Sequence, residues 1–129
     1  MKRLDLLASL DERQLVIVSG LLRPRFAVPR ERIIRKGDRG DGVYFIASGT
    51  VEVILPDRRI QIGAGAFFGE IALLSGRLRQ ADVVAVTYCQ LLVLRQSDFE
   101  QFMRENPDAR AASVRVAKAR QLTNTRKTE

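Results

Sequence analysis

The chain has 129 residues, of which 46% are apolar, and this supports the core of one domain but not of two. Its formal net charge of +7 lies at the ends, with ten Lys and Arg against five acidic residues in 1–40, six against eight in 41–106 and six against two in 107–129. The lack of His and the single Cys exclude an internal disulfide, most metal sites and His-based catalysis.

Residues 1–24 are predicted to form an N-terminal helical segment. Ser9 and Glu12 have the spacing of a capping box, and apolar residues follow at helical intervals. We expect a helix over about 11–22, with Ser9 as its N-cap and Pro24 beyond its end.

Residues 25–95 contain short alternating apolar runs separated by Gly, Pro and Asp, which is typical of a β-sandwich or a small barrel. This periodicity predicts strands at Phe26–Val28, Arg32–Arg35, Val43–Ala47, Thr50–Leu55, Arg59–Ile62, Ala81–Val86 and Gln90–Leu94.

Residues 96–121 are predicted to form two helices, followed by a frayed tail over 122–129. Ser97 and Glu100 match a second capping box, and the pair Asn106–Pro107 suits the N-cap and first position of a further helix. We therefore expect one domain in which many strands stand between helices.

The stretch "FFGEIALLSGRLRQADV", residues 67–83, carries the clearest chemistry. It is too short for a structural helix and too apolar for an open loop, so we expect one buried helical turn that starts at Gly69. Such a turn presents free backbone N–H groups to an anion, and Arg79 adds a planar donor fork from the other side. Glu70 on the rim can accept hydrogen bonds from sugar hydroxyls, so the segment predicts a nucleotide site.

A second interpretation of this spacing is a plain salt bridge between Glu70 and Arg79. A buried ion pair without a ligand is a poor source of stability, because desolvation costs about as much as the attraction returns. The salt-bridge interpretation is therefore weakened but not excluded. No nucleophile and base can be assigned, since Cys89 falls within a predicted strand region, so we do not expect an enzyme.

The same residues resemble the phosphate-binding cassette of the cyclic nucleotide-binding domain family, which includes the catabolite activator protein, the regulatory subunits of cAMP-dependent kinase and cyclic-nucleotide-gated channels. The family motif is F-G-E-(L/I)-A-L, a short gap, and P-R-(S/T/A)-A-(T/S)-V. This chain has "FGEIAL" at 68–73 and "LRQADV" at 78–83. The hairpin "KGDRGDGVYFIASGTVEV" is similar to the family's glycine-rich turns, and the resemblance covers about residues 10–120.

The resemblance implies an α+β fold that is mainly β. Residues 25–95 would form an eight-stranded antiparallel β-barrel of the jelly-roll type with a short buried cassette helix. One N-terminal helix would precede the barrel, and two C-terminal helices within 96–121 would close over the base as a lid.

The resemblance also implies a role for each site residue. Arg79 would bind the cyclic phosphate and Glu70 the ribose 2′-hydroxyl. Ile54 is expected to pack against the base or else to be plain core, and Arg120 to contact the purine or else to be solvated. The implied ligand-binding residues are Phe68, Gly69, Glu70, Ile71, Ala72, Arg79, Gln80, Ala81, Ile54 and Arg120, with no catalytic residue and no metal site.

Three positions depart from the family motif. Gln80 stands where a Ser or Thr hydroxyl is common, so the site has no evident device for cGMP, and cAMP is the expected ligand. Leu78 replaces Pro. Asp82 replaces Thr or Ser, and its carboxylate would disfavour a phosphate unless strand alternation turns it away from Ala81.

The expected function is a cyclic nucleotide-binding regulatory module, cytoplasmic and without a cofactor, in which ligand binding moves the C-terminal helices. Its expected partners are the nucleotide, cAMP or less favoured cGMP, and a bacterial channel or cation transporter domain in the same parent chain. No nucleic acid is expected, because residues 122–129 are too few for a DNA-binding helix-turn-helix. The sequence does not decide whether the domain forms a homodimer. The alternative is a degenerate domain of the same fold that binds another ligand or serves only in protein contacts.

Overall fold

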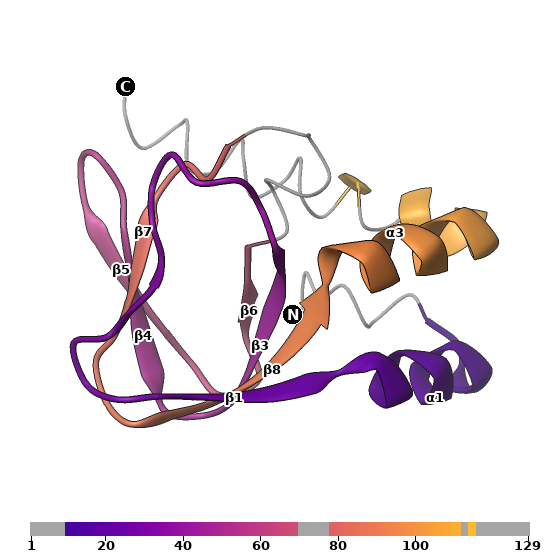
Figure 1. Cartoon of the computed structure of the whole chain (residues 1–129), viewed down its shortest axis with the longest axis horizontal. Coiled ribbons are helices and arrows are strands. Elements are labelled where there is room, and N and C mark those ends of the chain that lie inside the picture. Colours follow the sequence, from indigo (N-terminus) through magenta and orange to yellow (C-terminus); the bar gives the residue numbers. More distant parts are fainter. Residues whose placement is uncertain (1–9, 70–77, 112–113, 116–129) are drawn as a thin grey trace.

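The computed structural model describes residues 10–69, 78–111 and 114–115 of the chain. One helix, α1 (Glu12–Leu21), precedes the strands, and α3 (Gln96–Glu105) follows them, with further helical residues over 107–111 and 114–115 (Figure 1). The strands are β1 (Arg23–Ala27), β2 (Arg32–Ile34), β3 (Gly42–Ser48), β4 (Thr50–Ile54), β5 (Arg59–Gly63), β6 (Phe67–Phe68), β7 (Asp82–Ala85) and β8 (Cys89–Arg95).

The strands form two four-stranded sheets, and every pairing between named strands is antiparallel. One sheet has the order β1-β8-β3-β6 and the other β2-β7-β4-β5, with the two sheets on opposite sides of the interior (Figure 1). The predicted jelly roll is confirmed, but in the described part of the chain it is a pair of sheets and not one closed barrel. An apolar cluster from both sheets, including Tyr44, Val51 and Leu91, fills the space between them.

A second apolar cluster joins the helices to the outer face of the β3 and β8 sheet. Val43 and Leu94 on the strands pack with Val18 of α1 and with Phe99 and Phe102 of α3. In Figure 1 both helices accordingly lie on the same side of the molecule, beside β8. The start of α3 is thereby held close to the first residues of β3.

The capping box of α1 lies further along the chain than predicted. The N-cap is Asp11, whose carboxylate accepts a hydrogen bond from the Gln14 backbone at 2.8 Å, while the Gln14 side chain accepts one from the Asp11 backbone at 3.0 Å. The predicted N-cap, Ser9, lies outside the described residues. Pro24 is part of β1, where the edge of the sheet tolerates a residue without an N–H.

The second predicted capping box was wrong. Helix α3 begins at Gln96 with Arg95 as N-cap, and no side chain caps its first turn. Arg95 instead pairs with Asp98 at 3.1 Å across the first turn. The predicted restart at Asn106 is confirmed, because helical residues resume at 107 and the Arg110 N–H donates to the Asn106 carbonyl at 3.1 Å.

Candidate functional site

Arg79 is held by a loop far away in the sequence. Its backbone N–H donates to the Asp38 carbonyl at 2.8 Å, and its own carbonyl accepts from the Gly37 N–H at 2.9 Å. The neighbouring Leu78 forms an isolated antiparallel bridge with Arg39. The glycine-rich hairpin therefore fixes the backbone from which the arginine side chain projects.

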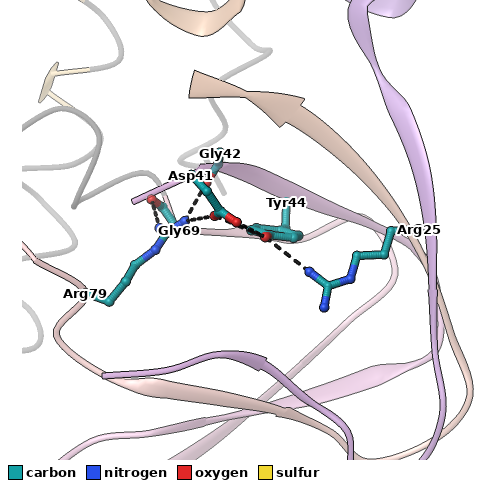
Figure 2. Close-up of polar contacts among 6 residues, drawn as sticks. All are labelled: Arg25, Asp41, Gly42, Tyr44, Gly69 and Arg79. Carbon is teal, nitrogen blue, oxygen red and sulfur yellow. Dashed lines mark hydrogen bonds and ion pairs between the residues drawn. The ribbon is translucent and has the colours of Figure 1, made fainter. Parts of the chain in front are cut away.

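The guanidinium of Arg79 lies inside the protein, with only 4% of its side chain exposed (Figure 2). Its Nη1 donates to the Gly69 carbonyl at 2.5 Å, and its Nη2 donates to the Gly42 carbonyl at 2.9 Å and to Asp41 Oδ1 at 2.8 Å. A buried charge requires such partners, since an unpaired one would be very costly. Among the described residues, Asp41 is the carboxylate that pairs with it, while Glu70 lies outside them.

Gly69 must be glycine because of Arg79. Its φ of +96° is a conformation that other residues rarely adopt. A Cβ at this position would lie 2.8 Å from Arg79 Nη1 and 3.0 Å from the Gly42 carbonyl oxygen. The sequence had suggested a close approach of ligand to this backbone, and the group that approaches it here is the arginine itself.

Tyr44 and Phe68 lie next to two of the groups that bind Arg79, namely Asp41 and Gly69. Their rings are stacked, with centroids 5.1 Å apart and planes 3° from parallel. The Tyr44 hydroxyl is 3.1 Å from both carboxylate oxygens of Asp41 and 3.3 Å from Arg25 Nη1 (Figure 2). Burial and, to a smaller degree, the Asp41 carboxylate raise the pKa of the Tyr44 hydroxyl above its ordinary value.

Asp82 has a structural partner of its own. Its Oδ1 accepts a hydrogen bond from the Lys36 backbone N–H at 2.7 Å. The carboxylate thus ties the start of β7 to the end of β2, which explains a residue that the family motif does not contain. Ala81 beside it is partly exposed and Gln80 is exposed.

The remaining predicted site residues divide into two groups. Ile54 closes β4, and its neighbour Val53 is the one that packs against the apolar cluster between the sheets. Because successive side chains of a strand point to opposite faces, Val53 and Ile54 face different sides. The residues outside the described part of the chain are Glu70, Ile71, Ala72 and Arg120.

Asp41 is the site residue that sequence reasoning missed. It lies in the glycine-rich hairpin, which was assigned only to turns. A buried arginine needs a carboxylate, but Asp41 and Arg79 are 38 positions apart in the sequence, and nothing local signals their contact. These two residues and Asp38 line a pocket of about 110 Å³, together with Arg32, Ile33, Ile34, Arg35 and Arg39.

No three His, Cys, Asp or Glu side chains of the described residues come together in a way that would hold a metal ion. In the same part of the chain, no helix is both long enough and apolar enough to cross a bilayer.

Comparison with known proteins gives relatives among ion channels. The chain is 41% identical over 103 residues to a cyclic nucleotide-gated potassium channel of Rhizobium etli, covering 80% of this chain and 29% of that protein. It is 38% identical over 104 residues to potassium/sodium hyperpolarization-activated cyclic nucleotide-gated channel 4 of Homo sapiens, covering 78% of this chain and 9% of that one. The chain therefore spans less than a third of the length of these relatives.

Solved structures with this fold come from several kinds of protein. The Thermus thermophilus catabolite activator protein has a TM-score of 0.78 and 27% identity, over 95% of this chain and 60% of that one. The regulatory subunit of a cAMP-independent protein kinase A from Trypanosoma brucei has a TM-score of 0.77 and 26% identity, over 91% of this chain and 41% of that one. The family model described as cyclic nucleotide-binding domain matches residues 24–106. The Arg79 guanidinium of the cassette is buried and hydrogen-bonded through both of its Nη atoms. Because the family model matches, the chain belongs to the cyclic nucleotide-binding domain family, whose members are regulatory binding modules and not enzymes.

Proposed function

We infer that the chain is a regulatory module that binds a cyclic nucleotide through Arg79, with cAMP preferred to cGMP, on the cytoplasmic side of a bacterial channel or cation transporter. The observation that carries this inference is the buried Arg79 guanidinium, held at the carbonyl of Gly69 where the cassette begins. Membership of the cyclic nucleotide-binding domain family supports a cyclic nucleotide as the ligand. The relatives among cyclic nucleotide-gated channels support a channel as the parent protein.

A cyclic phosphate suits the surroundings of Arg79. Two backbone carbonyls, of Gly42 and Gly69, fix the guanidinium before a ligand arrives, so binding need not order it. Its carboxylate partner Asp41 has a side chain that is 70% exposed, so the pair is open on the carboxylate side. Phosphate oxygens accept from a guanidinium in the same way as carboxylate oxygens do, and one fork can therefore serve both.

The apolar wall for the base is assigned to β4. Ile54 is the residue expected from the sequence, and Val53 is the neighbour that faces the apolar interior. A base that enters between the sheets would contact Val53, whereas a base held outside them would contact Ile54. Substituting each residue by Ala and measuring nucleotide affinity separates the two positions.

Two hydrogen bonds to one residue, Asp41, connect the proposed phosphate site with the C-terminal helices. The Asp41 carboxylate accepts from Arg79, and the Asp41 carbonyl accepts from the Gln96 N–H at 2.9 Å, where α3 begins. A phosphate that binds the same guanidinium as Asp41 therefore also affects the residue that holds the start of α3. This arrangement supports a module in which nucleotide binding displaces the C-terminal helices.

The preference for cAMP rests on Gln80. This exposed residue has an amide where family members commonly carry a hydroxyl that serves the phosphate or the guanine amino group. Gln80→Thr should therefore raise the affinity for cGMP relative to cAMP. An unchanged ratio of the two affinities would contradict this assignment.

Isothermal titration calorimetry tests the function directly. The unmodified chain should bind cAMP saturably, and Arg79→Ala should weaken binding by about tenfold to a hundredfold or more, because a charged hydrogen bond is worth about 1.5–3 kcal/mol. Arg59→Ala is the matched control, since it removes an exposed arginine that pairs with Glu52 at 3.3 Å. Equal affinities of the Arg79→Ala variant and the unmodified chain would refute the proposal.

A degenerate domain that binds another ligand is the second candidate. Two observations favour it: Asp41 already neutralises Arg79, and the structural neighbour from Trypanosoma brucei is described as cAMP-independent. A thermal-shift series with cAMP, cGMP and no ligand separates the two candidates. A ligand that binds the folded chain tightly must raise its melting temperature by mass action, so no shift with either nucleotide would favour this second candidate.

A further inference from the structure

We propose that Tyr44 is a positioning residue for Arg79, which it holds through two of the three groups that accept hydrogen bonds from the guanidinium, the Asp41 carboxylate at Nη2 and the Gly69 carbonyl at Nη1. This proposal deepens the proposed function and rests on it where it concerns nucleotide affinity. Tyr44 lies on β3 with 1% of its surface exposed and contacts no part of the Arg79 side chain through a hydrogen bond of its own. It acts through Asp41 on one side (Figure 2) and through Phe68, on which its ring stacks, on the other.

The first connection is the Tyr44 hydroxyl. It lies 3.1 Å from Oδ1 and 3.1 Å from Oδ2 of Asp41, and Oδ1 is the atom that accepts from Arg79 Nη2 at 2.8 Å. The Asp41 side chain is 70% exposed, and without a second anchor it would sample several rotamers in water. A rigid, buried donor selects the rotamer that faces Arg79.

The chemistry of the partners fixes the direction of these hydrogen bonds. Arg25 has donors only, so the Tyr44 hydroxyl accepts from Arg25 Nη1 at 3.3 Å. The Asp41 carboxylate has acceptors only, so the single hydroxyl proton of Tyr44 is donated to it. Arg25, which also pairs with Glu31 at 3.5 Å, thus leaves the hydroxyl proton committed to Asp41.

The second connection is the ring of Tyr44. It is paired with Phe68 in the register of β3 and β6 and stacks on it at 5.1 Å between centroids. Phe68 directly precedes Gly69, whose carbonyl accepts from Arg79 Nη1. The ring therefore supports the backbone on one side of the guanidinium, while the hydroxyl supports the carboxylate on the other.

Tyr44→Phe separates the two connections, because it removes the hydroxyl and keeps the stacked ring. Tyr88→Phe is a matched control, since Tyr88 is the second tyrosine of the chain and is 75% exposed at the β7–β8 turn. We expect Tyr44→Phe to fold and to lower cAMP affinity by about threefold to tenfold, which is less than the loss of a direct charged hydrogen bond because Tyr44 acts on Arg79 only through other groups. Tyr88→Phe should leave the affinity unchanged.

The first measurement needs no nucleotide. In the ligand-free 129-residue chain, the side-chain nitrogen and proton resonances of Arg79 should show slow guanidinium rotation in NMR spectra, and this rotation should become faster in Tyr44→Phe but not in Tyr88→Phe. Equally slow rotation in both variants would overturn the proposal. This outcome does not depend on whether the chain binds cAMP.

The second measurement is a double-mutant cycle in cAMP affinity with Asp41→Ala. If Tyr44 acts through Asp41, adding Tyr44→Phe to the Asp41→Ala variant should change the affinity by less than about twofold. The same fold loss in both backgrounds would mean that Tyr44 affects binding by a different route and would overturn the proposal. If the unmodified chain binds no cAMP, the proposed function fails, and the NMR comparison still decides the role of Tyr44.

Discussion

Asp41 and Arg79 form an ion pair of 2.8 Å in which the carboxylate side chain is 70% exposed and the arginine side chain is 4% exposed. The pair is therefore unequal: water can stabilise the carboxylate, whereas the guanidinium depends on its protein partners. Two of those partners are backbone carbonyls, which carry no net charge. Among the described residues, the Asp41 carboxylate is thus the charged group that compensates the buried positive charge of Arg79.

Asp41→Asn should lower the free energy of unfolding by about 1–2 kcal/mol. This loss lies between the effect of an exposed ion pair and that of a fully buried one, because only the arginine is buried. Glu52→Gln is the control, since Glu52 pairs with an arginine whose side chain is 68% exposed, and its cost should be below about 1 kcal/mol. Urea unfolding of both variants measures the difference, and equal costs would contradict the role given to Asp41.

Gly69→Ala should destabilise the chain more than Gly37→Ala does. Both glycines have a positive φ, +96° and +92°, so both substitutions carry the same backbone strain. A Cβ at Gly37 meets nothing within 4 Å, whereas one at Gly69 meets Arg79 Nη1 at 2.8 Å. The difference between the two losses of unfolding free energy therefore measures the steric conflict with the arginine, and we expect at least about 1 kcal/mol.

Gly69→Ala should also weaken cAMP binding more than Gly37→Ala does, because its Cβ meets the guanidinium itself, whereas Gly37 contacts Arg79 through a backbone hydrogen bond. Calorimetric titration of both variants checks this point. Equal affinities for the two variants would indicate that the position of Arg79 does not matter for the ligand.

Most of the strands were predictable because each contains a core residue in an alternating pattern. Strand β6 was not, since Phe67 and Phe68 are both buried and two residues cannot show a period. The cap of α1 was misplaced because polar residues at positions 9, 11, 12 and 14 offer two overlapping capping boxes. Which one forms depends on where the helix packs.

The contact between the two motif residues of the candidate site follows from their residue types, since few other residues could serve at either position. Arg79 and Gly69 are these two residues, and they are in contact. Asp41 comes from a loop that looks like an ordinary turn and Tyr44 from a predicted strand. They approach Arg79 through the pairing of β3 with β6 and through the contacts of residues 37–39 with residues 78–79. Contacts created by pairing between segments more than 20 positions apart have no signature in local spacing, which explains why these residues could not be predicted from the sequence.

Asp82→Ala should lower stability without affecting the nucleotide. The Asp82 carboxylate accepts a hydrogen bond from the Lys36 N–H at 2.7 Å. Without it this N–H can bond only to water, so the free energy of unfolding should fall by about 0.5–1.5 kcal/mol. Asp82→Ser retains an oxygen and should recover part of this loss. Thermal unfolding measures the stability, and calorimetry should give cAMP affinities within about twofold of the unmodified chain. A large gain in affinity would show that this carboxylate repels the phosphate.

The raised pKa of Tyr44 predicts a loss of stability in alkali. The folded chain keeps the Tyr44 proton at pH values where the unfolded chain releases it, so the unfolded state gains relative stability as the pH rises through and above the ordinary tyrosine pKa of about 10. The contribution is fully present below that pH. It should be absent from Tyr44→Phe, whose melting temperature should fall less steeply above about pH 10. In Tyr88→Phe, where Tyr44 is the remaining tyrosine, the ultraviolet absorbance of tyrosinate should appear with a midpoint above about 10, and a midpoint at or below that value would contradict the buried hydrogen bond to Asp41.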